Sequence, residues 1–145
     1  MTKFKKFILM PIKKVSKKIL GVDPGYGRVG IAVIEKDKTG EKLLHSECFE
    51  TDVKLPQSER LRLISLKIGD VLKKWQPDEL AIETLLFSKN VKTAIKVAEA
   101  RGVIIAEAAK GEIGIRELNP NQIKLAVTGY GKADKKQIMS MLEMI

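Results

Sequence analysis

Two acidic residues, Asp23 and Glu83, are the residues of this chain best placed to do chemistry. Each directly follows a short apolar segment, residues 19–22 and residues 80–82, and such segments are typical of buried strands. If the two strands are neighbours, both carboxylates lie at one edge of the sheet, where repulsion and desolvation are costly without a cation. Mg²⁺ is the cation we expect, because it is usually held by a few carboxylates together with substrate phosphate. A single acid at a strand end is more commonly a turn or cap residue, so the hypothesis depends on the pair.

The glycines that follow Asp23 match a nucleotide-binding pattern, G-x-G-x-x-G, at Gly25, Gly27 and Gly30. That pattern binds a pyrophosphate because its turn leads into the N-terminus of a helix. Residues 31–35 instead carry the alternation and β-branched side chains of a strand that returns from a hairpin. We therefore expect no dinucleotide here, and we assign the glycines to tight turning and close backbone approach beside Asp23.

Hydrophobic periodicity predicts the order of the elements that position these residues. Apolar or alternating runs predict strands over residues 18–23, 29–35, 43–49, 79–83 and 113–118. Apolar spacings of three and four residues predict helices from about residue 57 to 76, from 91 to 110, from 120 to 128 and from 134 onward. In the resulting order, βββαβαβαα, helices precede each of the last two strands, which must therefore lie parallel. The predicted fold class is α/β, a mixed five-stranded sheet flanked by helices, which is the ribonuclease-H-like arrangement.

The charge of the chain is concentrated at its N-terminus. The net charge is +9 over 145 residues, a length that suits one domain. Residues 1–18 contain seven lysines and no acid, and without them the net charge falls to +2. We expect a domain over residues 19–145, preceded by a basic extension over 1–18. That extension is a disordered arm with non-specific phosphate affinity, a short amphipathic segment, or a segment outside the functional domain.

The remaining composition bounds the class of protein. A single cysteine, Cys48, excludes a disulfide framework and a cysteine-based zinc site, so a cytoplasmic location is expected. No apolar run approaches the ~20 residues that span a bilayer, so no membrane contact is expected. The basic residues of the first predicted helix are expected to form a solvated face; they are Arg60, Arg62, Lys67, Lys73 and Lys74.

Four motifs in series resemble the RuvC family of Holliday-junction resolvases. They are residues 21–27, residues 82–83, Asn90 with residues 100–103, and residues 129–137. The resemblance runs from about Ile19 to the last residue, in order and with family-like spacing. It implies a homodimeric Mg²⁺-dependent endodeoxyribonuclease that binds four-way junction DNA. Such a protein nicks two opposing strands during DNA recombination and repair, alongside a branch-migration motor.

The resemblance also implies roles for particular residues. Asp23 and Glu83 correspond to family catalytic carboxylates and metal ligands. Lys124 and Lys135 correspond to DNA-contacting lysines. The family often has an aromatic residue shortly after the catalytic Glu that wedges at the junction centre, so Leu86 and Phe87 are candidates, with ordinary packing as the alternative. A complete site would perform two-metal hydrolysis, with Asp23 bridging two Mg²⁺ ions and Glu83 binding one of them while helping to orient the water.

The chain departs from the family pattern at its C-terminal end. The family has two further metal ligands, in an Asp-rich helix start beyond the helix that opens here near Asp134. Neither Asp134, explained as a helix cap, nor Glu143, within that helix, is a good substitute. The sequence is therefore expected to be C-terminally truncated.

Other functions compete with this hypothesis. The main alternative is a protein that binds junctions without cutting them, as the missing ligands would favour. An actin-like or sugar-kinase ATPase is disfavoured by the length of the chain. A nuclease that processes ribosomal RNA precursors is disfavoured by the motif at residues 129–137.

Overall fold

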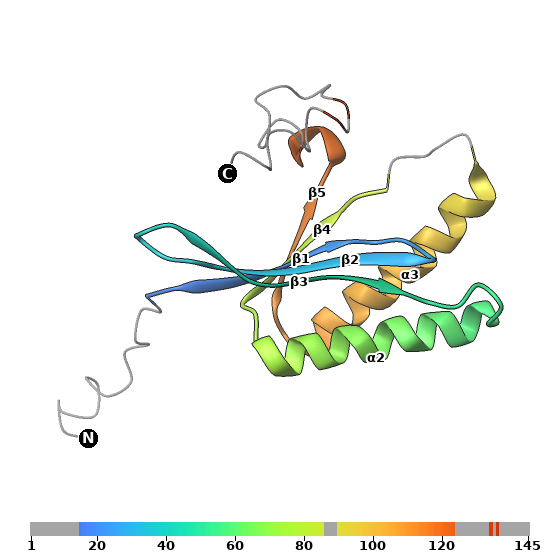
Figure 1. The fold of residues 1–145 in the computed structure, drawn as a ribbon, viewed down its shortest axis with the longest axis horizontal. Coiled ribbons are helices and arrows are strands. Elements are labelled where there is room, and N and C mark those ends of the chain that lie inside the picture. Colours follow the sequence, from blue (N-terminus) through green and yellow to red (C-terminus); the bar gives the residue numbers. More distant parts are fainter. Residues whose placement is uncertain (1–14, 86–89, 124–133, 135, 137–145) are drawn as a thin grey trace, which may run out of the picture.

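The computed structural model describes residues 15–85, 90–123, 134 and 136 of the chain. These residues contain a five-stranded sheet in the order β3-β2-β1-β4-β5 and two long helices, α2 and α3 (Figure 1). The elements are β1 (Lys17–Asp23), β2 (Arg28–Lys36), β3 (Glu41–Glu50), α2 (Gln57–Trp75), β4 (Glu79–Glu83), α3 (Val91–Lys110) and β5 (Gly114–Leu118). Within this part of the chain, no helix is long and apolar enough to cross a membrane.

The sheet is mixed, and its topology follows from the connections between its strands. β1, β2 and β3 form an antiparallel meander, whereas β4 pairs parallel to β1 and β5 pairs parallel to β4. Helix α2 connects β3 to β4, and α3 connects β4 to β5, because parallel neighbours need a long crossover. The predicted mixed sheet is therefore confirmed. Strand β1 begins at Lys17, so the last two residues of the expected basic extension belong to the sheet.

The predicted helix start at Asn119 and Pro120 is also confirmed, since helical residues begin at Pro120. The Oδ1 atom of Asn119 accepts a hydrogen bond from the backbone nitrogen of Gln122 at 2.8 Å, and Gln122 Oε1 accepts one from the backbone nitrogen of Asn119 at 2.9 Å. This reciprocal pair satisfies backbone donors at the start of the helix. The predicted course of this helix beyond Ile123, and most of the predicted last helix, lie outside the described residues.

The core lies between the sheet and the two helices, which run along the same face of the sheet (Figure 1). Its buried apolar side chains are Leu20, Val22, Val29, Ile31, Val33, Ile64, Ile68, Val71, Leu80, Ile82, Ala100, Ile104 and Ala108. Along β1 and β4 these residues alternate with others, because successive side chains of a strand point to opposite faces. Asp23 and Glu83 are therefore directed to the face of the sheet that α2 and α3 do not cover.

Arg60 lies in the core, so the prediction that it belongs to a solvated helix face is wrong. It is only 4% exposed, whereas Arg62, Lys73 and Lys74 are exposed as predicted. The reason is its position: Arg60 precedes the buried Ile64 by four residues, and residues four apart share one face of a helix. The burial of Arg60 is thus decided by its position on the inner face of the helix and not by its charge.

A partly buried polar contact between the helices predicts a pH dependence of stability. Ser65 of α2 donates a hydrogen bond to Glu107 of α3 at 2.7 Å, and Lys110 pairs with the same carboxylate at 2.9 Å. The Ser65 bond, followed by the Lys110 bond, lowers the pKa of Glu107 below its ordinary value of 4.5. Because the pKa is lowered in the folded state, this contribution to stability is present above pH 4.5 and is lost as the pH falls through the folded pKa.

We expect Glu107→Gln to flatten the decline of the unfolding free energy between about pH 6 and pH 3, as measured by urea denaturation. Glu59→Gln is the matched control, because Glu59 pairs with Arg62 on the exposed surface of a single helix. Its effect on that slope should be smaller, since solvent screens an exposed pair. Equal effects of the two substitutions would contradict a special role for the contact between helices.

Candidate active site

The structure brings Asp23 and Glu83 to the same end of two neighbouring strands. The parallel pairing of β1 with β4 aligns Val22 with Ile82, and the two acids directly follow this aligned pair. Val22 and Ile82 are buried against the helices, so both acids are directed to the opposite face. Ligand sites in open α/β sheets commonly lie outside the carboxyl ends of parallel strands, and the two acids occupy such a position.

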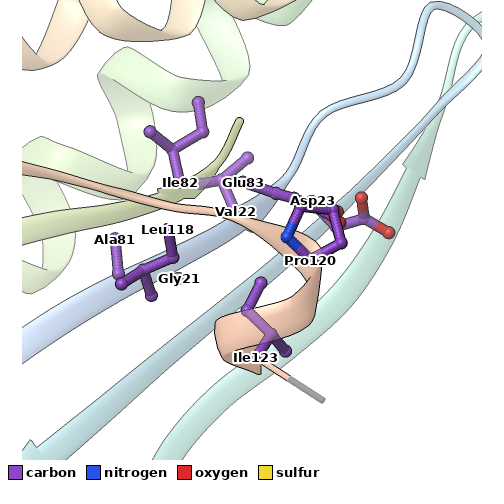
Figure 2. Close-up of a pocket in the computed structure, with 9 residues that line it drawn as sticks. All are labelled: Gly21, Val22, Asp23, Ala81, Ile82, Glu83, Leu118, Pro120 and Ile123. Atoms are coloured by element: carbon purple, nitrogen blue, oxygen red, sulfur yellow. The ribbon is translucent and has the colours of Figure 1, made fainter. Parts of the chain in front are cut away.

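An open pocket of about 420 Å³ lies between these strand ends (Figure 2). It is lined by the ends of β1, β4 and β5 and by the first turn of the helix that follows; the residues are Gly21, Val22, Asp23, Ala81, Ile82, Glu83, Leu118, Pro120 and Ile123. Asp23 and Glu83 are its acidic members, and the others are apolar or lack a side chain. A second hollow of about 210 Å³ shares Glu83 and Pro120 with this pocket and extends to Pro24 and Leu85.

The loop after Asp23 turns back into β2 and not into a helix, which removes the structural basis for a dinucleotide site. A Cβ atom at Gly25 would lie 2.2 Å from the carbonyl oxygen of Arg28, so the turn requires glycine there. Gly30 pairs directly with Asp23 in the sheet, and a Cβ atom at Gly30 would lie 3.3 Å from the Cβ of Asp23. The expected close approach of backbone beside Asp23 is therefore observed.

Arg60 of α2 supports this loop through contacts with Thr51 and Tyr26. Its Nε donates to Thr51 Oγ1 at 2.9 Å, and the backbone nitrogen of Thr51 donates to the carbonyl oxygen of Gly27 at 3.1 Å. The guanidinium carbon lies 5.2 Å from the centre of the Tyr26 ring, which is within the range of a cation–π contact. Its Nη2 atom is buried and has no hydrogen-bond partner within the described residues. Sequence reasoning missed Arg60, although its spacing from Ile64 was a signal.

The two carboxylates form a donor set that fits a hard divalent cation. Oxygen ligands of this kind are those that Mg²⁺ prefers, and the open pocket leaves room for further oxygen ligands from water or phosphate. In the part of the chain that the structure describes, no group of three or more His, Cys, Asp or Glu side chains gathers to hold a metal. Asp23 and Glu83 are therefore the metal-ligand candidates that the described structure offers.

The residues expected to contact DNA cannot be placed relative to this pocket. Leu86, Phe87, Lys124 and Lys135 all lie outside the described residues. Leu85, which precedes Leu86, and Ile123, which precedes Lys124, line the two hollows around Glu83, whereas the described neighbours of Lys135 line neither.

Comparison with known proteins identifies the family. A family model described as "Crossover junction endodeoxyribonuclease RuvC" matches residues 19–145. The chain belongs to the RuvC family. It is 45% identical over 130 residues to the RuvC of Thermosipho melanesiensis, which covers 88% of this chain and 82% of that relative. It is 47% identical over 125 residues to the RuvC of Thermotoga maritima, which covers 85% of this chain and 73% of that relative.

A solved RuvC structure has the same fold. Thermus thermophilus RuvC in complex with a Holliday junction substrate matches with a TM-score of 0.80 at 29% identity, covering 88% of this chain and 78% of that one. The RuvC fold is thus shared over most of the chain.

The turn after Asp23 predicts the effect of adding a methyl group to it. We expect Gly25→Ala to lower the unfolding free energy by about 1–3 kcal/mol or more, because the new Cβ collides with backbone that cannot rotate away. Gly69→Ala in α2 is the control, since its Cβ would meet the nearest atom, of Glu107, at 3.9 Å. The control should raise stability by up to about 1 kcal/mol. Urea denaturation measures both, and a Gly25→Ala protein as stable as the wild type would contradict the geometry of the loop.

Proposed function

We propose that this RuvC-family protein is an endonuclease that resolves four-way (Holliday) DNA junctions in recombination and repair by Mg²⁺-dependent hydrolysis. The observation that carries the proposal is the pair Asp23 and Glu83, which line one open pocket at neighbouring strand ends. The names of the matching relatives, crossover junction endodeoxyribonucleases, support the same reaction.

The form of the pocket suits a polymeric substrate. It opens to solvent on the face of the sheet that α2 and α3 leave uncovered, and Asp23 is exposed. A phosphodiester in a DNA backbone can approach such a surface, whereas a small substrate is usually enclosed. The apolar members Leu118, Pro120 and Ile123 add no charge that would compete with a phosphate or a cation.

In this proposal Asp23 and Glu83 are the catalytic residues and would hold two Mg²⁺ ions together with the further ligands that the family resemblance implies. When bound, the ions supply the positive charge that makes water nucleophilic at neutral pH and stabilises the leaving oxygen. Asp23, at the end of β1, would be a ligand common to the ions, and Glu83, at the end of β4, would be a ligand to one of them and would help to orient the water. The products would be a 5′ phosphate and a 3′ hydroxyl.

The contacts with DNA are proposed from the family resemblance. Lys124 and Lys135 would bind backbone phosphates, and Leu86 or Phe87 would pack at the junction centre. The lysines of residues 1–18 would add sequence-independent affinity for phosphate. We also propose that the protein acts in the cytoplasm with a branch-migration motor, as the resemblance implies.

We further propose a homodimer formed through α3. This helix exposes apolar and small residues at positions that share one face: Val91, Ile95, Ala98 and Gly102. Val91 is 64% exposed and Ile95 is 54% exposed, so a second copy of the chain would bury them. Small residues such as Ala98 and Gly102 let two helices approach closely. A two-fold dimer supplies two equivalent sites, which symmetric nicking of opposing strands requires.

The reaction is tested by substituting the carboxylates. We expect Asp23→Asn and Glu83→Gln each to lower the nicking rate of a synthetic four-way junction by more than about 100-fold, since even indirect ligand partners contribute ~10–100-fold. Junction binding, measured by gel shift, should be retained, and a chelator should stop wild-type nicking until Mg²⁺ is restored. Asp37→Asn, in the exposed hairpin between β2 and β3, is the control with full activity. Wild-type protein that binds junctions without cutting them would contradict the proposal.

The dimer is tested by charging the exposed face of α3. We expect Ile95→Glu to shift the protein toward monomer, because a carboxylate at the contact must be desolvated. Leu66→Glu on α2 is the matched control, because Leu66 is similarly exposed, at 52%, on the other helix. Sedimentation velocity measures both variants. A wild-type protein that is monomeric at micromolar concentration, or an Ile95→Glu variant that remains dimeric, would overturn the α3 interface.

A further inference from the structure

Arg101 of α3 contacts the end of β4 directly. Its Nε donates a hydrogen bond to the backbone carbonyl oxygen of Glu83 at 2.9 Å, and its Nη2 forms an ion pair with the carboxylate of Glu117 on β5. The Arg101 side chain is only 16% exposed. One guanidinium group thus joins α3 to β4 and β5, two of the three strands whose ends line the pocket.

The backbone at Glu83 needs such support because the sheet stops there. The register of β4 with β5 ends at the pair Glu83 and Leu118, and the ends of strands fray unless they are tied down. On one side, the backbone nitrogen of Thr84 donates to the carbonyl oxygen of Leu118 at 2.8 Å. On the other side, the bond from Arg101 fixes the carbonyl group of Glu83 itself. The residue is therefore held by a neighbouring strand and by a helix.

The chemistry of this contact suits a residue that must bind a cation. The Arg101 bond runs to the carbonyl oxygen of Glu83, whereas the carboxylate lines the pocket on the face of the sheet away from α3. A guanidinium bonded to the carboxylate would compete with a metal ion for the same oxygens. A bond to the backbone orients the side chain without that competition, and the planar fork of arginine can hold two acceptors at fixed angles.

We propose that Arg101 is the positioning residue for Glu83, acting through the backbone to hold its carboxylate ready for a divalent cation. The inference rests on the proposed function, because it gives Glu83 the role of a metal ligand. Residues that orient metal ligands typically contribute about 10–100-fold to metal affinity or activity. We expect a loss of metal affinity and activity of this size when the guanidinium group of Arg101 is removed.

The experiment compares Arg101→Gln, Arg101→Lys and Arg116→Gln. Arg116, in the middle of β5, is the matched control, because it also pairs with a glutamate, at 2.7 Å, but that partner, Glu79, is the first residue of β4, at the other end of the strand from Glu83. Three quantities are measured: Mn²⁺ affinity from water-proton relaxation, amide hydrogen exchange at Thr84 without metal or DNA, and single-turnover nicking of a four-way junction. The Mn²⁺ binding that is lost in Asp23→Asn is the part that takes place at the pocket, because Asp23 lines it.

For Arg101→Gln we expect Mn²⁺ affinity and nicking to fall by about 10–100-fold, with faster exchange at Thr84 and unchanged junction affinity. Arg101→Lys keeps the charge but cannot reach both acceptors. Its Mn²⁺ affinity, Thr84 exchange rate and nicking rate should therefore lie between those of Arg101→Gln and those of the wild type. Arg116→Gln should match wild type in all three measurements.

Unchanged Mn²⁺ affinity in Arg101→Gln, or an equal loss in Arg116→Gln, would overturn the positioning role. Wild-type protein that binds no Mn²⁺ at the pocket would overturn it as well, because there would be no site to orient. Wild-type protein that binds Mn²⁺ but cuts no junction would contradict the proposed function alone. In that case the Mn²⁺ and exchange data still decide the role of Arg101.

Discussion

Between β1 and β4 the backbone aligns Val22 with Ile82, and Asp23 and Glu83 directly follow this pair. The site depends on this register because side chains alternate between faces with a period of two. A shift of one residue in either strand would direct one acid into the core, beside Leu20 and Leu80, and leave the other alone in the pocket. Burial of the apolar partners therefore fixes the register, and the register in turn pairs the carboxylates. The hydrophobic core and the chemistry are specified by the same strands.

Each helix places one arginine near the site: Arg101 bonds directly to backbone, whereas Arg60 bonds to the side chain of Thr51. Arg60 of α2 lies under the loop that follows Asp23, with Thr51 as its hydrogen-bond acceptor and Tyr26 stacked on it. Arg101 of α3 bonds to the carbonyl of Glu83. A buried guanidinium is costly when no acid pairs with it, and Arg60 has no ion pair within the described residues. Within the described residues its partners are instead the Thr51 hydroxyl and the Tyr26 ring, and its Nη2 atom has no hydrogen-bond partner.

Much of this arrangement could be predicted from the sequence, because it depends on patterns that are local. The strand ending in Asp23, the strand ending in Glu83 and the cap at Asn119 each have a distinct signal over a few residues. The pairing of the two acids followed from topology, since helices must connect parallel strands. Arg60 and Arg101 could not be assigned from the same patterns. Their roles depend on which backbone atoms lie within reach across the core, and a charged residue on a helix is most often solvated.

The site lies between strands that are paired antiparallel and close in sequence and strands that are paired parallel across a helix, and this affects the stage of folding at which it forms. The pairings of β1 with β2 and of β2 with β3 connect residues near in sequence, and such contacts form with little loss of chain entropy. The pairing of β1 with β4 must wait until the whole of α2 has been synthesised and folded back. Asp23 therefore leaves the ribosome long before its partner Glu83. Before β4 pairs with β1 the chain has Asp23 but no paired carboxylates, so the candidate active site forms only when this long-range pairing is made.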